Sequence, residues 1–144
     1  MVDVHTQLQA VDLSINPGRL QVQALDGVLD YTSAAGFSSS GLVGTLWGET
    51  VTADVQQRQS ARAGGVPTGF RNSVFELSLA SRVDASDVQN WLGLEALALA
   101  QGRTSLTGSV RVDPGGAPVL SLVSDMVGVS LDLPAPWAKA AELP

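Results

Sequence analysis

Residues 2–22 read VDVHTQLQAVDLSINPGRLQV, and this stretch predicts the fold of the chain. Apolar and polar side chains alternate through residues 2–8, which is the period of a β-strand with one face turned to a core. The alternation slips by one residue at residues 10–11, as it does at a β-bulge. Residues 16–18, Asn-Pro-Gly, are typical of a turn, and the alternation then resumes with a second slip near residues 24–25. The stretch therefore predicts two antiparallel strands joined by a turn.

The same period of two continues through the rest of the 144 residues. We expect a single domain, residues 1–144, with an all-β, mainly antiparallel fold of about seven or eight strands and one short helix. Loops are expected at residues 33–40 and 57–69, and Asp26-Gly27 is either a turn or a bulge. The expected strands after the first turn cover residues 20–25, 28–31, 41–47, 50–56, 74–83, 104–112 and 119–133, the last with a bulge at Gly128.

The single helix is expected just after residue 84. Asp84 or Ser86 would cap its N-terminus, and Asp87 would favour the positive end of its dipole. Gly93 would end it. An apolar stripe would face the sheet, and it consists of Val88, Trp91 and Leu92. Residues 94–100 have a helical composition but are too short to decide between helix and other structure.

The composition excludes several classes of partner. The chain is 44% hydrophobic and 15% charged, whereas typical soluble domains carry about 25% charged residues. The formal net charge of −6 argues against binding to nucleic acid and against electrostatic docking on anionic lipid. No apolar run approaches the roughly 18 residues of a membrane-spanning helix, and there is no cysteine. The first residues resemble a strand interior rather than a signal peptide, so we expect a piece of a longer chain.

Residues with catalytic or ligand-binding chemistry are few. His5 is the only histidine, and its place in the polar phase of a strand favours an exposed, structural side chain. Asp84 and Asp87 are the nearest candidate metal ligands, but helix capping explains them better. The glycines of residues 41–48 do not match a phosphate-binding loop. Asp125 is expected to face solvent or to cap local backbone amides. We therefore predict that the chain is not an enzyme and binds no cofactor or metal.

The apolar strand residues are the unusual feature of the sequence. One short helix cannot cover one face of seven strands. Either the sheet closes on itself as a sandwich or barrel, or it keeps an open apolar face, and strands spaced about 4.8 Å apart would make that face a trough roughly 30 Å long. An open trough would bind lipid, because each buried CH₂ contributes about 0.8 kcal/mol. The sequence does not decide which strand face would line it. The in-phase candidates for such a groove are Leu8, Leu13, Leu20, Val22, Leu42, Leu46, Val51, Val55, Phe75, Leu77, Leu79, Leu106, Val110, Leu120, Leu122, Met126 and Leu131.

The last part of the chain reads SDMVGVSLDLPAPWAK over residues 124–139, and it resembles a segment of the YhdP family of AsmA-like envelope proteins. Met126 stands where the family usually has leucine. Residues 25–31, 41–42 and 46–48 resemble the family's pattern of strand, small loop, strand and glycine, and residues 88–92 and Gly108 also fit. The motif residues that carry the resemblance are Ser124, Asp125, Gly128, Leu133, Pro134, Pro136, Trp137 and Lys139.

The resemblance implies a fold and a function. Members of this family are large proteins of Gram-negative bacteria, anchored in the inner membrane and extending through the periplasm as curved, elongated, repeating β-grooves. They are implicated in moving phospholipid to the outer membrane. The chain would then be an interior, periplasmic segment of the groove, in contact with phospholipid acyl chains and with neighbouring segments of the same chain, and it would contain no transmembrane span. The alternatives are a closed β-sandwich that binds protein or glycan through loops such as residues 57–69 and, more remotely, a hydrolase built around His5.

Overall fold

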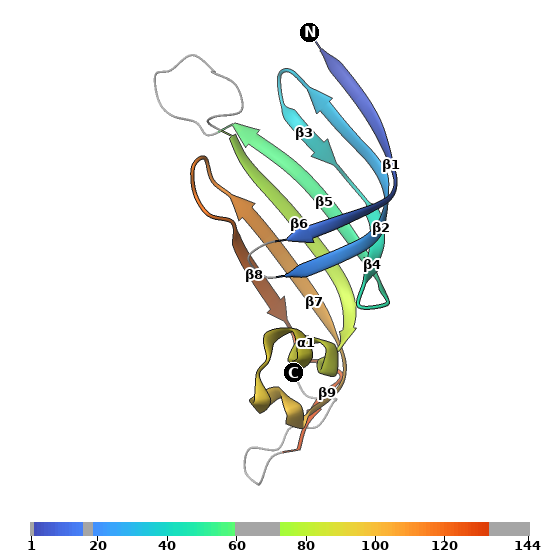
Figure 1. Ribbon diagram of the computed structural model, residues 1–144, viewed down its shortest axis with the longest axis vertical. Helices are drawn as coiled ribbons and strands as arrows, with labels where there is room; N and C mark the ends of the chain where they lie inside the picture. Colours follow the sequence, from blue (N-terminus) through green and yellow to red (C-terminus); the bar gives the residue numbers. More distant parts are fainter. Residues whose placement is uncertain (1, 16–18, 60–72, 133–144) are drawn as a thin grey trace.

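The computed structural model describes residues 2–15, 19–59 and 73–132 (Figure 1). Nine strands of these residues form one sheet in which every ladder is antiparallel. The prediction of an all-β, antiparallel fold with one short helix is therefore confirmed. The elements in chain order are β1 (Asp3–Ile15), β2 (Leu20–Thr32), β3 (Gly36–Ser39), β4 (Leu42–Leu46), β5 (Glu49–Gln59), β6 (Ser73–Asp84), α1 (Ala85–Leu92), the 3₁₀ helix η2 (Glu95–Leu99), β7 (Ala100–Val112), β8 (Val119–Ser124) and β9 (Val129–Leu131).

The order of strands in the sheet follows the chain closely. It is β1-β2-β3-β5-β6-β7-β8, with β4 paired to β2 and β5, and β9 paired to the start of β7. Strands β1 and β8 are thus the two ends of this path. Helix α1 and η2 lie at one end of the sheet, near β9 (Figure 1).

The first hairpin bends over the rest of the sheet. The pairing of β1 with β2 shifts register on either side of Val11, and Ala10 and Ala24 have φ values of 50° and 48°. Beyond these positions β1 and β2 turn and cross in front of β6 (Figure 1). We call residues 11–15 and 20–25 the hairpin tip. The slips expected at residues 10–11 and 24–25 are confirmed. Asp26-Gly27 was expected to be a turn or a bulge; it forms no turn, and both residues continue strand β2 beside the register shifts.

The core lies between the hairpin tip and the sheet. Ile15, Leu20 and Val22 of the tip are at most 6% exposed and belong to the same cluster as Leu79 and Val110 of the sheet. A smaller cluster joins the helical end to the sheet, and it consists of Ala85, Ala100 and Val129 with Met126 and Leu131 packed against them. The sheet therefore covers part of its apolar face with its own first hairpin.

Several predicted boundaries were wrong. The strand expected at residues 104–112 begins at Ala100, and those expected at residues 20–25 and 28–31 form the single strand β2. Residues 33–40 were expected to form a loop, but they contain strand β3, whose small residues pair with β2 from Leu29 to Thr32. Residues 119–133 were expected to form one long strand, but they form β8 and β9. The backbone turns between these strands at Met126 and Gly128, which have φ values of 57° and 88°. Strand β5 extends to Gln59, and most of the loop expected at residues 57–69 lies outside the described residues.

The helix begins and ends where the sequence predicts, but its cap differs. Asp84 is the N-cap residue, yet its side chain makes no capping hydrogen bond. One of its carboxylate oxygens lies 3.9 Å from Nε of Arg103 instead. Ser86 lies inside the helix. Gly93 ends it in the left-handed conformation with φ of 66°, as predicted.

The apolar face of the helix is narrower than predicted. Val88 and Trp91 pack against the core, and the Trp91 ring lies 5.8 Å from the ring of Trp47 at the turn between β4 and β5. Leu92 was expected in the same stripe, but it is 44% exposed. The interpretation of Trp91 as the residue that pins the helix to the sheet is confirmed.

Gly102 provides a test of the junction between β7 and β9. Its φ is 117°, and a Cβ there would collide with the backbone carbonyl oxygen of Gly128, which has no freedom to move as a side chain would. We expect Gly102→Ala to lower the free energy of unfolding by about 3 kcal/mol or more in urea titrations. Gly115→Ala is the matched control, because Gly115 has φ of 72° and open space around it, and it should cost about 1 kcal/mol. Equal losses in the two variants would contradict the close approach.

Candidate functional site: an apolar cleft beside the hairpin tip

The structure brings most of the predicted groove residues into one cluster. Eight of them are buried in the main core: Leu20, Val22, Leu42, Leu46, Val51, Leu79, Leu106 and Val110. Six more are half-buried against that core: Leu8, Leu13, Val55, Leu77, Leu120 and Leu122. Met126 and Leu131 pack instead against the small cluster at the helical end. Phe75 is half-buried and lines the cleft described next.

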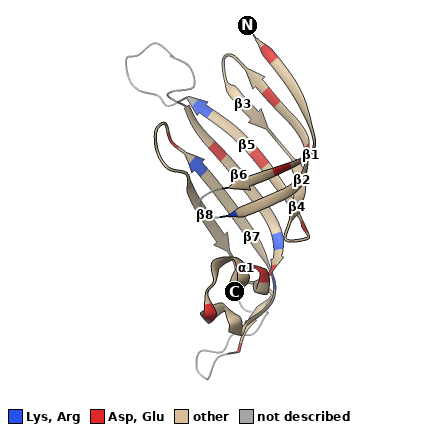
Figure 2. Ribbon diagram, viewed as in Figure 1, with Lys and Arg blue, Asp and Glu red and all other residues tan. Residues whose placement is uncertain are grey.

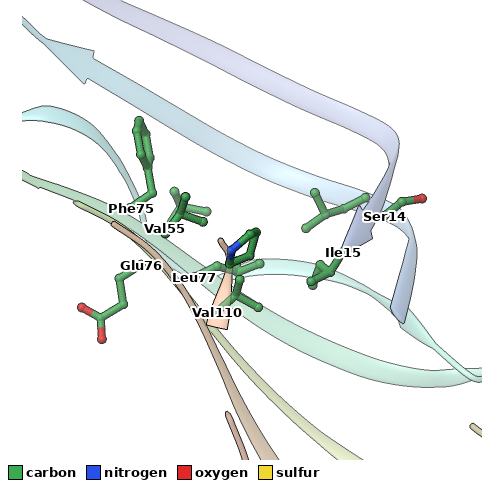
Figure 3. Close-up of a pocket in the computed structure, with 10 residues that line it drawn as sticks. Ser14, Ile15, Val55, Phe75, Glu76, Leu77 and Val110 are labelled. Atoms are coloured by element: carbon green, nitrogen blue, oxygen red, sulfur yellow. The ribbon is translucent and has the colours of Figure 1, made fainter. Parts of the chain in front are cut away.

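An apolar cleft of about 220 Å³ lies where the hairpin tip meets the sheet (Figure 3). It is open to solvent on one side, and three elements of the sheet form its floor: β5, β6 and β7. The tip forms its wall. The lining residues are Leu13, Ser14, Ile15, Val55, Phe75, Glu76, Leu77, Val110, Val112 and Pro118. Five of the predicted groove residues therefore meet at this cleft: Leu13, Val55, Phe75, Leu77 and Val110.

The register of the sheet explains why the floor of the cleft is apolar. Val55 pairs with Leu77, Leu77 with Val110, and Val110 with Leu120, so one row of aliphatic side chains crosses four strands. Opposite residues of an antiparallel pair share a face, and residues two apart on a strand return to it. Glu76 lies between two floor residues of β6, and its side chain points away from Ile15 (Figure 3). The alternation in the sequence thus becomes one apolar face and one polar face.

Aromatic side chains continue from the edge of the cleft. The ring of Phe37 on β3 lies 6.4 Å from that of Phe75 and 4.8 Å from that of Tyr31 on β2. These are distances at which tilted aromatic pairs attract. Gln57, which is buried near them, accepts a hydrogen bond of 3.0 Å from the backbone N–H of Phe37 and so ties β3 to β5. The apolar surface therefore extends from the cleft toward β2.

Sequence reasoning missed several residues of this region, among them Val112, Ile15, Phe37 and Pro118. Val112 continues the phase of Val110 and was identifiable by that signal. Ile15 continues the phase of Leu13 in the same way. Phe37 lies in the segment expected to be a loop, so no periodicity pointed to it. Pro118 precedes β8, and nothing in its sequence context indicated a place in the cleft.

Charged groups lie outside the floor of the cleft. They are spread over the strands, several of them in pairs of opposite charge, rather than gathered in one patch (Figure 2). Glu76 pairs in register with Arg111. Arg111 donates hydrogen bonds of 3.0–3.3 Å to Asp113, and this bonding, followed by the negative charge of Asp113, raises the pKa of Arg111 above its usual value. The cleft floor therefore offers apolar contact without an ion-pairing group.

The residues considered for catalysis or metal binding have structural surroundings. His5 lies on strand β1 with a side chain 77% exposed, and its Nδ1 is 2.5 Å from Oδ1 of Asp30 on the neighbouring strand. The expectation of an exposed strand histidine is confirmed. Asp84 and Asp87 lie at the start of α1. Within residues 2–15, 19–59 and 73–132, no three His, Cys, Asp or Glu side chains come together as a metal site would require.

The motif residues form a turn between β8 and β9. Oγ of Ser124 is 2.9 Å from Oγ1 of Thr104 and accepts a hydrogen bond of 3.1 Å from the backbone N–H of Met126. Asp125 caps the local backbone, as predicted, because its Oδ1 accepts hydrogen bonds of 3.0 Å from the N–H of Val127 and from Oγ1 of Thr104. Gly128 completes the turn with its positive φ. The remaining motif residues lie outside the described residues: Leu133, Pro134, Pro136, Trp137 and Lys139.

Asp125 offers a test of this structural role. Asp125→Ala would leave the N–H of Val127 and the hydroxyl of Thr104 without their shared acceptor. We expect the free energy of unfolding to fall by about 1–3 kcal/mol. Asp125→Asn keeps one acceptor oxygen and should lose less in the same urea titrations. If both variants unfold like the wild type, Asp125 does not hold the turn.

Comparison of the chain with models of known protein families, with curated proteins and with solved structures gave no match. The resemblance to the YhdP family therefore stays a prediction. In the part of the chain that the structure describes, no helix has the length and apolar character needed to cross a membrane.

Proposed function

We propose that this chain is a non-enzymatic segment of a conduit that carries phospholipid between two membranes. Its cleft would receive acyl chains. The observation that carries the proposal is the solvent-open cleft of about 220 Å³ whose floor is the aliphatic row of Val55, Leu77 and Val110. The charge-free floor suits a hydrocarbon chain better than it suits a polar metabolite.

The size of the cleft limits what it holds. Pockets that bury drug-sized ligands measure about 300–1,000 Å³, so a cleft of about 220 Å³ takes part of one acyl chain. Each CH₂ that enters it contributes about 0.8 kcal/mol relative to water. The rest of the chain would lie along the half-buried aromatic side chains of Phe37 and Tyr31. A series of such contacts lets a lipid move without exposing its whole length to water at once.

The cellular setting of the proposal comes from the resemblance. The segment would belong to an inner-membrane-anchored protein of a Gram-negative bacterium and would lie in the periplasm. Neighbouring segments of the same chain would continue the groove as a repeating structure.

One observation favours a second candidate. The hairpin tip buries Leu20 and Val22 almost completely against the sheet, at 1% and 0% exposure, so this part of the apolar face is closed. A closed sandwich that serves as a scaffold or adhesion module would have the same core. It would bind protein or glycan through its loops and would carry no lipid.

Leu77→Asp separates the two functions. A carboxylate in the centre of the apolar row would oppose hydrocarbon in the cleft, and burying a leucine-sized group is worth about 1.5–3 kcal/mol. After incubation with phosphatidylethanolamine vesicles, we expect native mass spectrometry to show about tenfold less bound phospholipid on the variant than on the wild type, or even less.

Ser78→Asp is the matched control for this variant. Ser78 is the next residue of β6, is exposed and lies on the opposite face, so the same charge there should leave lipid retention unchanged. Circular dichroism would establish that both variants are folded. Full lipid retention by folded Leu77→Asp would reject the cleft as the binding site, and a wild-type chain without lipid would favour the closed module.

A further inference from the structure

The two ends of the sheet differ in how their edge strands are protected. An edge strand presents unpaired backbone N–H and C=O groups, and natural sheets keep other strands away from them with charged side chains, bulges and bends. Strand β1 has these devices, since it carries Asp3 and Asp12 and its register shifts on either side of Val11. Strand β8 has none of them. Its sequence, VLSLVS, contains no charged residue, no proline and no glycine, and it pairs with β7 without a register shift.

Strand β8 also exposes apolar side chains beside its free edge. In the described part of the chain it pairs with β7 alone, so its other edge has no neighbouring strand (Figure 1). Val119 and Val123 are 57% and 68% exposed on the outer face of the sheet. Six-residue segments with high β-propensity, low net charge and no proline pair readily with another strand. Strand β8 is therefore a surface for strand addition.

The sequence of β8 is self-complementary in one antiparallel register. Residues opposite each other in an antiparallel pair lie on the same face of the sheet. With Ser121 opposite Ser121 of a second copy, each Leu120 lies opposite a Leu122, and each Val119 lies opposite a Val123. A shift by two residues in either direction would place Ser121 opposite a valine. The first register thus pairs every apolar residue of 119–123 with an apolar residue.

We propose that β8 pairs with β8 of a second copy of this chain, antiparallel about a two-fold axis at Ser121. In a two-fold pair the same strand of both copies forms the contact, so both unprotected edges are covered at once. The pairing also continues the apolar face of the sheet, because Leu120, which pairs with Val110 of the cleft floor, meets Leu122 of the second copy. This inference goes beyond the proposed function and needs no lipid.

The size of the contact sets the expected affinity. Only residues 119–123 of each copy would pair, and interfaces below about 1,200 Å² are typical of weak complexes. We expect a reversible dimer with a Kd on the order of 10 μM. Sedimentation velocity of the full chain without lipid, from about 1 to about 200 μM, would measure it.

Val123→Lys tests whether this edge forms the dimer. A lysine on an edge strand opposes strand addition, and the two-fold axis introduces it twice in each dimer. We expect the Kd to rise at least about tenfold. Val28→Lys is the matched control, because Val28 is 48% exposed but lies on β2, which has β1 and β3 as neighbours. This variant should dimerise like the wild type, and circular dichroism would verify that both are folded.

Ser121→Cys tests the register, because the chain contains no cysteine. Opposite Cα atoms of an antiparallel pair lie about 4.5–5.5 Å apart, which a disulfide can bridge. We expect oxidised glutathione to convert this variant into a covalent dimer. Val123→Cys is its control, since the two cysteines would lie four residues apart along the paired strands, or about 13 Å. Under the same oxidation it should form no cross-linked dimer.

Three results would overturn the inference. The first is a chain that stays monomeric at the highest concentration. The second is a Kd that folded Val123→Lys leaves unchanged, because the dimer would then use another surface. The third is equal cross-linking of Ser121→Cys and Val123→Cys, which would show contact without the proposed register. None of these results bears on the cleft, which lipid retention by Leu77→Asp tests separately.

Discussion

An antiparallel sheet with one apolar face has to remove that face from water, and in this chain the cover is the sheet's own first hairpin. The cover forms only because β1 and β2 bend at Ala10 and Ala24. Each left-handed alanine costs about 1–2 kcal/mol. Burying Ile15, Leu20 and Val22 contributes about 1.5–3 kcal/mol for each side chain. The free energy gained by burying these three side chains exceeds the strain of the two alanines. The packing of the hairpin tip against the sheet therefore maintains the bends.

Much of the fold could be predicted from the sequence because apolar and polar residues alternate in most of its strands. The period of two located most strands, and Gly93 marked the end of the helix. The short strand β3 was missed because its residues, Gly-Phe-Ser-Ser, show no apolar alternation, and its existence depends on pairing with the end of β2. The break between β8 and β9 was missed for a similar reason. It depends on contacts of the turn with Thr104, which lies far away in the sequence.

The candidate site could be predicted only in part. Alternation correctly selects side chains that leave the solvent, and the seventeen groove candidates are all buried or half-buried. Alternation does not tell which of them will be covered by another part of the chain. Leu20 and Leu77 stand in the same apolar–polar alternation, yet Leu20 is buried in the core and Leu77 lines the cleft. The difference is set by where the hairpin bends, which is a property of the whole sheet.

The arrangement of strands also has a consequence for the entropy of the chain. All nine described ladders join strands that are consecutive in the sequence or have one strand between them, so each closes a short loop at little entropic cost. The contacts of the core cluster that contains Ile15, Leu20 and Val110 are different, because they connect segments separated by most of the chain. Their cost is reduced once the intervening strands are paired, since the pairing shortens the path between them. The fold thus combines many local strand pairings with one long-range contact, the packing of the hairpin tip on the sheet. That contact also forms the boundary of the cleft.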